Sequence, residues 1–276
     1  MHRDWRREIT CMLLVATLAG CGSNKVRGDG PPSGSVAIPD LPGDAVPRPE
    51  PRSKYGNGPI YEVLGQAYRV MDTSDGYRER GVASWYGKKF HGNLTSMRET
   101  YDMYQMTAAH KTLPLPTYVR VRNLRNGKSV VVRVNDRGPF VHNRVIDLSY
   151  AAAQKLDMIK DGTSLVEVEA IGFGEPAGDR PTRNTTAAPR VEAREPETGE
   201  TVYVQVGAFG DRNNARRRVQ LLRSGGIGNT RVFEDKSSNQ TLYRVRIGPV
   251  RNVGQYDLIV EELDKLGISD PYLVTE

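Results

Sequence analysis

Hydrophobic and polar residues alternate in two parts of the chain, residues 80–173 and 201–276. The first part holds short β-branched runs, and two of them flank the strong hairpin signal Asn126-Gly127. One segment has helical spacing instead, and Ser149 is a good N-cap for it. Many short strands with little helix predict an all-β barrel or sandwich. The expected elements are strands at 119–121, 130–134 and 165–171 and one helix at 151–156.

The second part follows the order strand, helix, strand, strand, helix, strand, which is typical of a small α+β domain. Alternation begins at Val202, so Tyr203 and Gln205 should face away from the helices. By the same parity, Arg244 and Arg246 should also face away from the helices, and Phe209 ends the first strand. The expected elements are a strand from 202 to 206, a helix ending at Gly225, strands at 230–235 and 241–247, a helix at 256–266 and a strand at 271–274.

Two segments are rich in proline and contain no aromatic residue, 22–54 and 174–200. Such segments cannot bury enough apolar surface to offset the entropy of ordering the chain, so we expect flexible tethers there. The sequence therefore predicts two separate folded domains. The expected division is a signal segment at 1–20, a tether at 21–54, an extended lead-in at 55–79, a barrel at 80–173, a linker at 174–200 and a second domain at 201–276.

The N-terminus indicates export. Basic residues precede a short apolar run at 9–19, which ends in small residues before Cys21. This is typical of a secretory signal and is too short to span a membrane. The ending Leu-Ala-Gly-Cys resembles the bacterial lipobox, which implies that Cys21 becomes the lipidated first residue of a membrane-anchored chain. Gly22 in place of the inner-membrane retention residue Asp then implies the outer membrane, facing the periplasm.

The charge of the chain has to be interpreted with this compartment in mind. The formal net charge is +6, and residues 80–173 hold 14 Lys and Arg against 8 Asp and Glu. Basic proteins often bind nucleic acid, but an exported chain meets none, whereas the cell wall is an acidic polymer. Cys11 lies in the removed signal, so no disulfide is expected. We expect a monomer.

A series of short motifs runs through the first domain in a fixed order. At these spacings the series resembles the rare lipoprotein A family, over about 55–173. The resemblance implies a double-psi β-barrel that acts on peptidoglycan as a lytic transglycosylase. The motifs include GVASWYG at 81–87, FHG at 90–92, YDM at 101–103, TAAH at 107–110, NDRGPF at 135–140 and RVIDLS at 144–149.

The reaction implied by this resemblance needs only one carboxyl group. A lytic transglycosylase breaks the MurNAc–GlcNAc linkage without water, because the sugar's own 6-hydroxyl closes a 1,6-anhydro ring. One carboxyl can protonate the leaving oxygen and then accept the proton of the 6-hydroxyl. The family pattern places this acid on Asp136 and implies active-site positions at Glu99, Asp102 and His110. Glu99 and Asp102 would face one wall if their turn is helical. No metal or cofactor is expected.

Each of these residues also has a plain structural interpretation. Asp136 could cap a turn, and a single histidine such as His110 is usually a hydrogen-bonded structural residue. Trp85 and Tyr86 could stack on sugar rings, but alternation along a strand makes core packing of one of them equally expected.

Arg98 departs from the family pattern, which usually has glycine there. An arginine disfavours a positive φ, and its cation beside Glu99 would favour the ionised carboxylate. This would suit a stabilising role for Glu99 better than an acid role. The departure also keeps open a non-catalytic lipoprotein that only binds the wall.

Residues 201–276 resemble a SPOR domain, through YVQVGAF at 203–209 and YRVRIGP at 243–249. That resemblance implies a ferredoxin-like sheet that binds peptide-free glycan strands at division septa. Tyr203, Gln205, Phe209, Arg244 and Arg246 are the expected glycan-binding residues, and an ordinary solvated sheet face is the alternative.

The favoured hypothesis is a septum-targeted endolytic transglycosylase that cleaves denuded glycan to 1,6-anhydroMurNAc ends. The first alternative is a catalytically inactive septal lipoprotein with a structural role. The second is a muramidase that uses Glu99 and Asp136 as a water-dependent pair.

Overall fold

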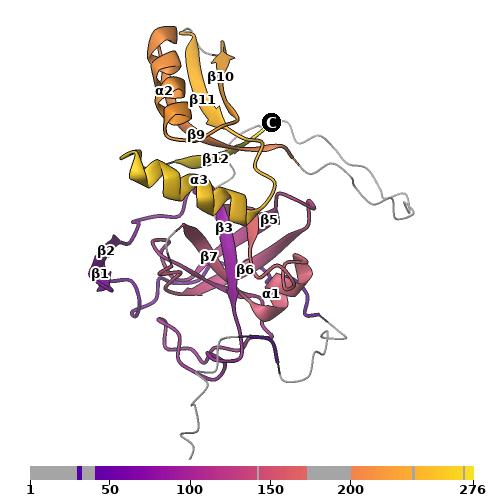
Figure 1. The fold of residues 1–276 in the computed structure, drawn as a ribbon. Coiled ribbons are helices and arrows are strands. Elements are labelled where there is room, and N and C mark those ends of the chain that lie inside the picture. Colours follow the sequence, from indigo (N-terminus) through magenta and orange to yellow (C-terminus); the bar gives the residue numbers. More distant parts are fainter. Residues whose placement is uncertain (1–29, 33–40, 142, 173–199, 238–239, 270) are drawn as a thin grey trace, which may run out of the picture.

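The computed structural model describes residues 30–32, 41–141, 143–172, 200–237, 240–269 and 271–276. Two modules follow one another along the chain (Figure 1). The barrel module contains β3 (Arg78–Tyr86), β4 (Thr107–His110), β5 (Thr117–Asn123), β6 (Ser129–Asp136), β7 (Arg144–Ser149), α1 (Tyr150–Lys155) and β8 (Ser164–Ala170). The C-terminal module contains β9 (Val202–Phe209), α2 (Arg212–Ser224), β10 (Thr230–Asp235), β11 (Leu242–Ile247), α3 (Val253–Lys265) and β12 (Tyr272–Thr275).

The six barrel strands close on themselves in the order β3-β7-β4-β6-β5-β8. The pairs β3·β7 and β4·β6 are parallel, and the other neighbours are antiparallel. This confirms the predicted double-psi β-barrel. Ser149 caps α1 as expected, because its hydroxyl accepts a hydrogen bond from the Ala152 N–H at 3.3 Å.

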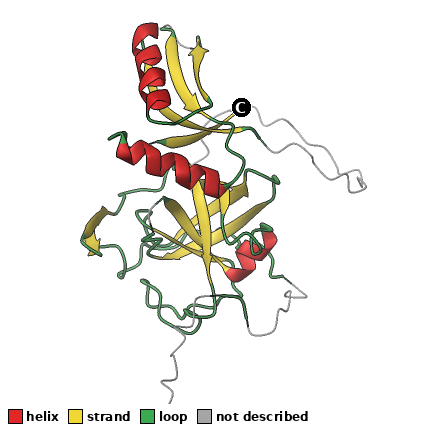
Figure 2. Cartoon of the chain, viewed as in Figure 1, coloured by secondary structure: helices red, strands yellow, loops and turns green. Residues whose placement is uncertain are grey.

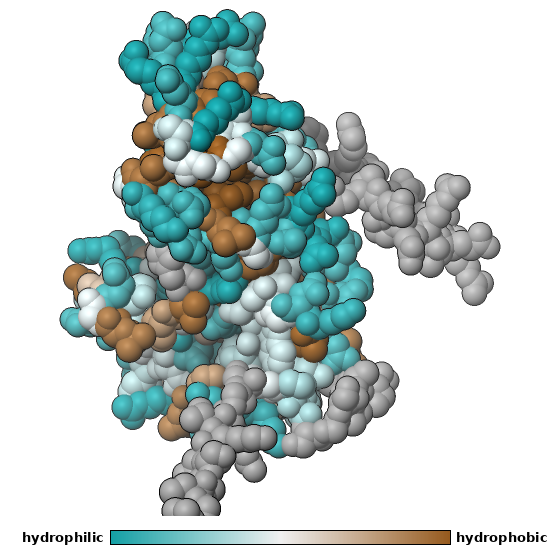
Figure 3. Space-filling view, in the orientation of Figure 1, coloured by the Kyte–Doolittle hydropathy of each residue, from teal (hydrophilic) through white to brown (hydrophobic). Residues whose placement is uncertain are grey.

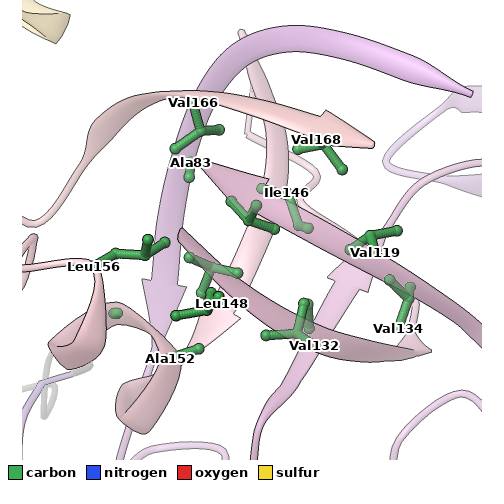
Figure 4. Packing of buried hydrophobic residues seen from close by; sticks show 14 of the residues in the cluster. Ala83, Val119, Val132, Val134, Ile146, Leu148, Ala152, Leu156, Val166 and Val168 are labelled. Carbon is green, nitrogen blue, oxygen red and sulfur yellow. The ribbon is translucent and has the colours of Figure 1, made fainter. Parts of the chain in front are cut away.

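The inside of the barrel is filled by β-branched and small side chains that alternate inward along each strand (Figure 4). Val119, Val132, Val134 and Ile146 are all fully buried there. Ala152 and Leu156 from α1 and the turn after it close one side of this core. The catalytic candidates therefore lie on loops and strand ends carried by a rigid core.

The segment before the barrel is not wholly a tether. Residues 41–54, which we call the strap, lie against the barrel. The Ala45 N–H donates to the Val131 carbonyl at 3.0 Å, and the Ser53 N–H donates to the Leu115 carbonyl at 2.9 Å. The prediction of a flexible tether over 21–54 is thus wrong for 41–54. Backbone pairing and ion pairs attach the strap, and Ala45 also packs against the barrel core.

The predicted extended lead-in at 55–79 contains a hairpin, β1 (Ile60–Val63) and β2 (Gln66–Arg69), turned at Leu64 and Gly65. Both turn residues have positive φ, as a tight two-residue hairpin turn requires. The hairpin exposes Ile60 and Leu64, and apolar surface stands out on it at the left of Figure 3.

The C-terminal module is a four-stranded antiparallel sheet in the order β10-β11-β9-β12. Helices α2 and α3 contribute Ala215, Leu222, Val260 and Leu263 to its core. Asp211 and Asn252 cap the two helices. This is the predicted α+β domain, with every element in the expected order.

The two modules are packed together, with α3 lying between the small sheet and the barrel (Figures 1 and 2). Val82, Leu124 and Leu165 of the barrel are buried in the same apolar cluster as the core of the C-terminal module. Arg144 Nη2 lies 3.6 Å from Asp257 Oδ2 across the interface. The expected linker at 174–200 lies outside the described residues except for Glu200, which pairs with Arg122.

Candidate active site

Asp136 is the last residue of β6, and its carboxylate is fixed at one oxygen. Oδ1 accepts hydrogen bonds from the Ser96 N–H at 2.7 Å, from the Ser96 hydroxyl at 2.6 Å and from the Arg137 N–H at 2.8 Å. Within the described residues Oδ2 has no hydrogen-bond partner, and Asp136 is only partly buried. One oxygen thus orients the group while the other remains open to a ligand.

Ser96 comes from a tight turn over 95–99, which holds Glu99 as well. The Thr95 N–H donates to the Glu99 carbonyl at 2.7 Å, and the Arg98 N–H donates to the Thr95 carbonyl at 2.8 Å. The turn requires a φ of 63° at Arg98. Arg98 therefore adopts the conformation that we expected an arginine to resist. Its guanidinium stacks on the Tyr55 ring at 4.2 Å.

The cation beside Glu99 is Arg133, not Arg98 as the sequence suggested. Arg133 Nη1 and Nη2 donate to the two Glu99 carboxylate oxygens at 2.8 and 3.0 Å, and Asn135 Nδ2 donates to Glu99 at 2.8 Å. Burial alone would raise the pKa of Glu99, but these hydrogen bonds outweigh it, and the pKa lies below its usual value. Glu99 is therefore ionised and unsuited to donate a proton.

His110 is enclosed rather than presented at a site. Its side chain is 2% exposed, Nδ1 accepts from the N–H groups of Thr112 and Leu113, and Nε2 lies 2.7 Å from the Tyr77 hydroxyl. Burial lowers the pKa of His110 to about 3, so the ring is neutral. Because both nitrogens are used within the fold, the geometry fits the structural interpretation and not the catalytic one.

The helical turn that would bring Glu99 and Asp102 to one wall does not form. Residues 99–102 are not helical, since Thr100 bridges to Leu94 in an antiparallel arrangement. Asp102 instead accepts from the Tyr104 N–H at 3.0 Å and lies 3.7 Å from His91 Nδ1. The condition on which the expected shared wall depended is thus not met.

Trp85 and Tyr86 follow the expectation that one of them packs in the core. Tyr86 is 8% exposed and stacks on Tyr101 with ring centroids 4.1 Å apart. Trp85 is partly exposed and meets Tyr150 edge-on at 5.5 Å. Only Trp85 therefore retains surface for a sugar ring.

The loop after Asp136 is held by the segment that precedes the barrel. The Arg137 guanidinium donates to the carbonyls of Gly56 at 2.8 Å and Leu113 at 2.6 Å, and to Asn57 Oδ1 at 3.1 Å. Phe140 packs on the hairpin rings of Tyr61 and Tyr68 at 6.3 and 5.6 Å. The lead-in thus fixes the position of the Asp136 loop.

On the C-terminal module, four of the five expected binding residues share the open face of the sheet. Tyr203, Arg244 and Arg246 are partly exposed there, whereas Gln205 is only 1% exposed. Its Oε1 accepts from Arg246 Nε at 3.1 Å and its Nε2 donates to the Tyr272 hydroxyl, so Gln205 is occupied within the fold. Phe209 does not join them. A β-bulge at the β9–β11 pairing places Phe209 opposite Tyr243, and both pack on the helix side with the core.

Two family models match this chain: lytic transglycolase at residues 78–168 and SPOR domain at 198–275. The endolytic peptidoglycan transglycosylase RlpA of Vibrio cholerae serotype O1 is 40% identical over 270 residues, covering 96% of this chain and 95% of that protein. The chain belongs to the RlpA family. The RlpA of Neisseria meningitidis serogroup A is 53% identical over 210 residues, covering 75% and 79% of the two chains. The crystal structure of the RlpA SPOR domain from Pseudomonas aeruginosa matches at 29% identity with a TM-score of 0.23, covering 26% of this chain and 96% of that one.

In this RlpA-family chain, sequence reasoning overlooked the residues that hold the carboxylates. Asn135 stands inside the NDRGPF motif and Ser96 lies three residues before Glu99, so proximity in sequence to Asp136 and Glu99 was their only signal. Arg133 was visible as a polar position in the alternation of β6. Glu50, which also pairs with Arg133 at 2.8 Å, had no signal, because the two residues lie far apart in sequence.

Across the described ranges, no group of three or more His, Cys, Asp or Glu residues is arranged to hold a metal ion. No helix in that part of the RlpA-family chain is long and apolar enough to cross a membrane. The signal segment and the lipidation site at Cys21 lie outside the described residues.

Proposed function

We propose that the barrel of this RlpA-family protein cleaves peptidoglycan as an endolytic transglycosylase, with Asp136 as the acid and then the base. This assignment rests on the different surroundings of the two carboxylate oxygens of Asp136. Three donors fix Oδ1, while Oδ2 is free to face a substrate oxygen. General acid–base catalysis requires this combination of fixed orientation and one accessible oxygen.

The chemistry needs no water. Protonated Asp136 gives its proton to the oxygen that links MurNAc C1 to GlcNAc, and the C1–O bond breaks. The resulting carboxylate then accepts the proton of the MurNAc 6-hydroxyl, whose oxygen bonds to C1 and closes the 1,6-anhydro ring. The proton returned in the second step restores the acid, so the cycle balances.

Glu99 has a different role in this proposal. The ionised carboxylate stabilises the positive charge that develops at C1 and the ring oxygen as the glycosidic bond breaks. Its hydrogen bonds to Arg133 and Asn135 support this role, since they keep it ionised and fixed at neutral pH.

The C-terminal module binds denuded glycan strands on its open sheet face and targets the protein to the division septum. Tyr203, Arg244 and Arg246 supply the hydrogen-bond donors and the aromatic surface, and the buried Gln205 positions Arg246. The partly exposed Trp85 contributes a stacking surface on the barrel. Phe209 is left out of this set.

The protein reaches the septum as a lipoprotein of the outer membrane. Acylation of Cys21 after removal of the signal supplies the anchor, and one folded copy on one anchor is sufficient, so the protein acts as a monomer.

The test uses purified protein and peptide-free glycan strands, with the products identified by mass spectrometry. Wild-type protein yields anhydro ends, which are one water lighter than reducing ends. Asp136→Asn lowers the rate by about 10²- to 10⁴-fold, the usual contribution of a general acid–base residue. Asp157→Asn is the control, because Asp157 is 71% exposed and pairs only with Lys128. Reducing ends, or cleavage by D136N at the wild-type rate, would refute the assignment.

A further inference from the structure

The strap carries a carboxylate into the surroundings of Glu99. Glu50 Oε1 accepts from Arg133 Nε at 2.9 Å, and Glu50 Oε2 accepts from Arg133 Nη2 at 2.8 Å. The side chains of Glu50 and Arg133 are each only 17% exposed. The Tyr118 hydroxyl donates to Glu50 Oε1 at 2.5 Å, which fixes the carboxylate from the barrel side.

Arg133 therefore lies between two carboxylates and binds both in a bidentate manner. Its Nε and Nη2 face Glu50, and its Nη1 and Nη2 face Glu99. A guanidinium is planar, so two hydrogen bonds on one edge determine the direction of the adjacent edge. The orientation in which Arg133 meets Glu99 is thus set from the strap.

The same arrangement sets the charge near the site. The hydrogen bonds from Arg133 lower the pKa of Glu50 to about 2, so Glu50, Arg133 and Glu99 are all ionised at neutral pH and together carry one negative charge. Without Glu50, Arg133 and Glu99 would form a neutral pair. A neutral pair attracts the developing positive charge at C1 less than a net negative cluster does.

We infer that Glu50 is a positioning residue for the transglycosylase reaction: by orienting and neutralising Arg133, it keeps the Glu99 carboxylate aligned and effective as an anion. This inference rests on the proposed function. It makes Glu50, the strap residue that contacts Arg133, part of what completes the active site. Glu50 itself touches no substrate and acts only through Arg133 and Glu99.

The test is a double-mutant cycle in the full chain, with kcat and KM measured on peptide-free glycan. Glu50→Gln removes the charge and is expected to lower kcat about tenfold, as the loss of an outer hydrogen-bonding partner commonly does, with KM nearly unchanged. In a Glu99→Gln background, the same change should have almost no further effect on kcat, because Glu50 acts through Glu99. Glu50→Asp retains the charge and should stay closer to the wild type than E50Q.

Asp44→Asn is the matched control, because Asp44 lies in the same strap but pairs with Lys155. Asparagine can still accept the hydrogen bond that the Val131 N–H gives to Asp44 at 3.0 Å. D44N should keep the wild-type kcat. An unchanged kcat in E50Q, or an equal loss in the presence and absence of Glu99, would overturn the inference while leaving the proposed function intact. Wild-type protein that leaves glycan uncut would instead overturn the proposed function.

Discussion

The buried His110 makes the stability of the barrel depend on pH in a way that one substitution should remove. Protonation of the folded protein would put a cation where Nδ1 now accepts two backbone N–H groups. Burial, together with the nearby charges of Arg137 and Lys111, depresses the pKa of His110 from 6.5 to about 3 on folding. Between these values the unfolded chain binds the proton and the folded chain does not, so stability is full above pH 6.5 and falls as the solution is acidified. From pH 7 to pH 4.5 the linkage relation gives a loss of about 2.5 kcal/mol.

His110→Asn tests this, because asparagine Oδ1 can replace Nδ1 as the acceptor but does not titrate. At pH 7 the variant should be less stable by about 1–3 kcal/mol, since the hydrogen bond to Tyr77 is lost. Denaturant unfolding can be followed by the fluorescence of Trp85, the only tryptophan after residue 5. The stability gap between wild type and variant should shrink by about 2.5 kcal/mol from pH 7 to pH 4.5. A difference in unfolding free energy that stays constant with pH would refute the argument. If H110N folds but cleaves glycan more than about a hundredfold more slowly, His110 would have to be counted among the catalytic residues.

Two further pairs of substitutions test the turn at Arg98 and the packing of the modules. Arg98→Gly should be more stable to urea than Arg98→Ala by about 1 kcal/mol, because only glycine adopts the positive φ freely; equal stability would show that the turn relaxes at no cost. Leu124→Glu places a charge in the buried interface between the modules and should separate them, which small-angle X-ray scattering would detect as a larger radius of gyration. Leu258→Glu changes a side chain that is 65% exposed and should leave the scattering profile as it is, so a similar expansion in both variants would contradict the packed arrangement.

Local patterns predicted the elements well because the forces that form them are local. The alternation over 130–134 and the cap at Ser149 depend on residues close in sequence, and both are confirmed in β6 and α1. The parity of β9 failed only at Phe209, because the bulge that shifts its face depends on pairing with β11.

The candidate site was predicted only in part for the same reason. Asp136 and Glu99 stand inside recognisable motifs, so the resemblance located them. The ion-paired residues around Glu99 carry no such signal. Arg133 lies on β6, far along the chain from Glu99, and Glu50 lies in a proline-rich segment that lacks the apolar residues by which folded structure is usually detected. Ion pairs of this kind leave no periodicity in a sequence.

Val82, Leu124 and Leu165 pack against the C-terminal core, and this packing fixes the distance between the two modules. With the modules joined through a shared apolar cluster, the distance between the proposed glycan-binding face and the proposed cleavage site is constant. A strand shorter than that distance can occupy one module but not both. The enzyme would thus release such fragments readily and retain longer ones, and the interface, rather than either site, would set the length at which a product is released.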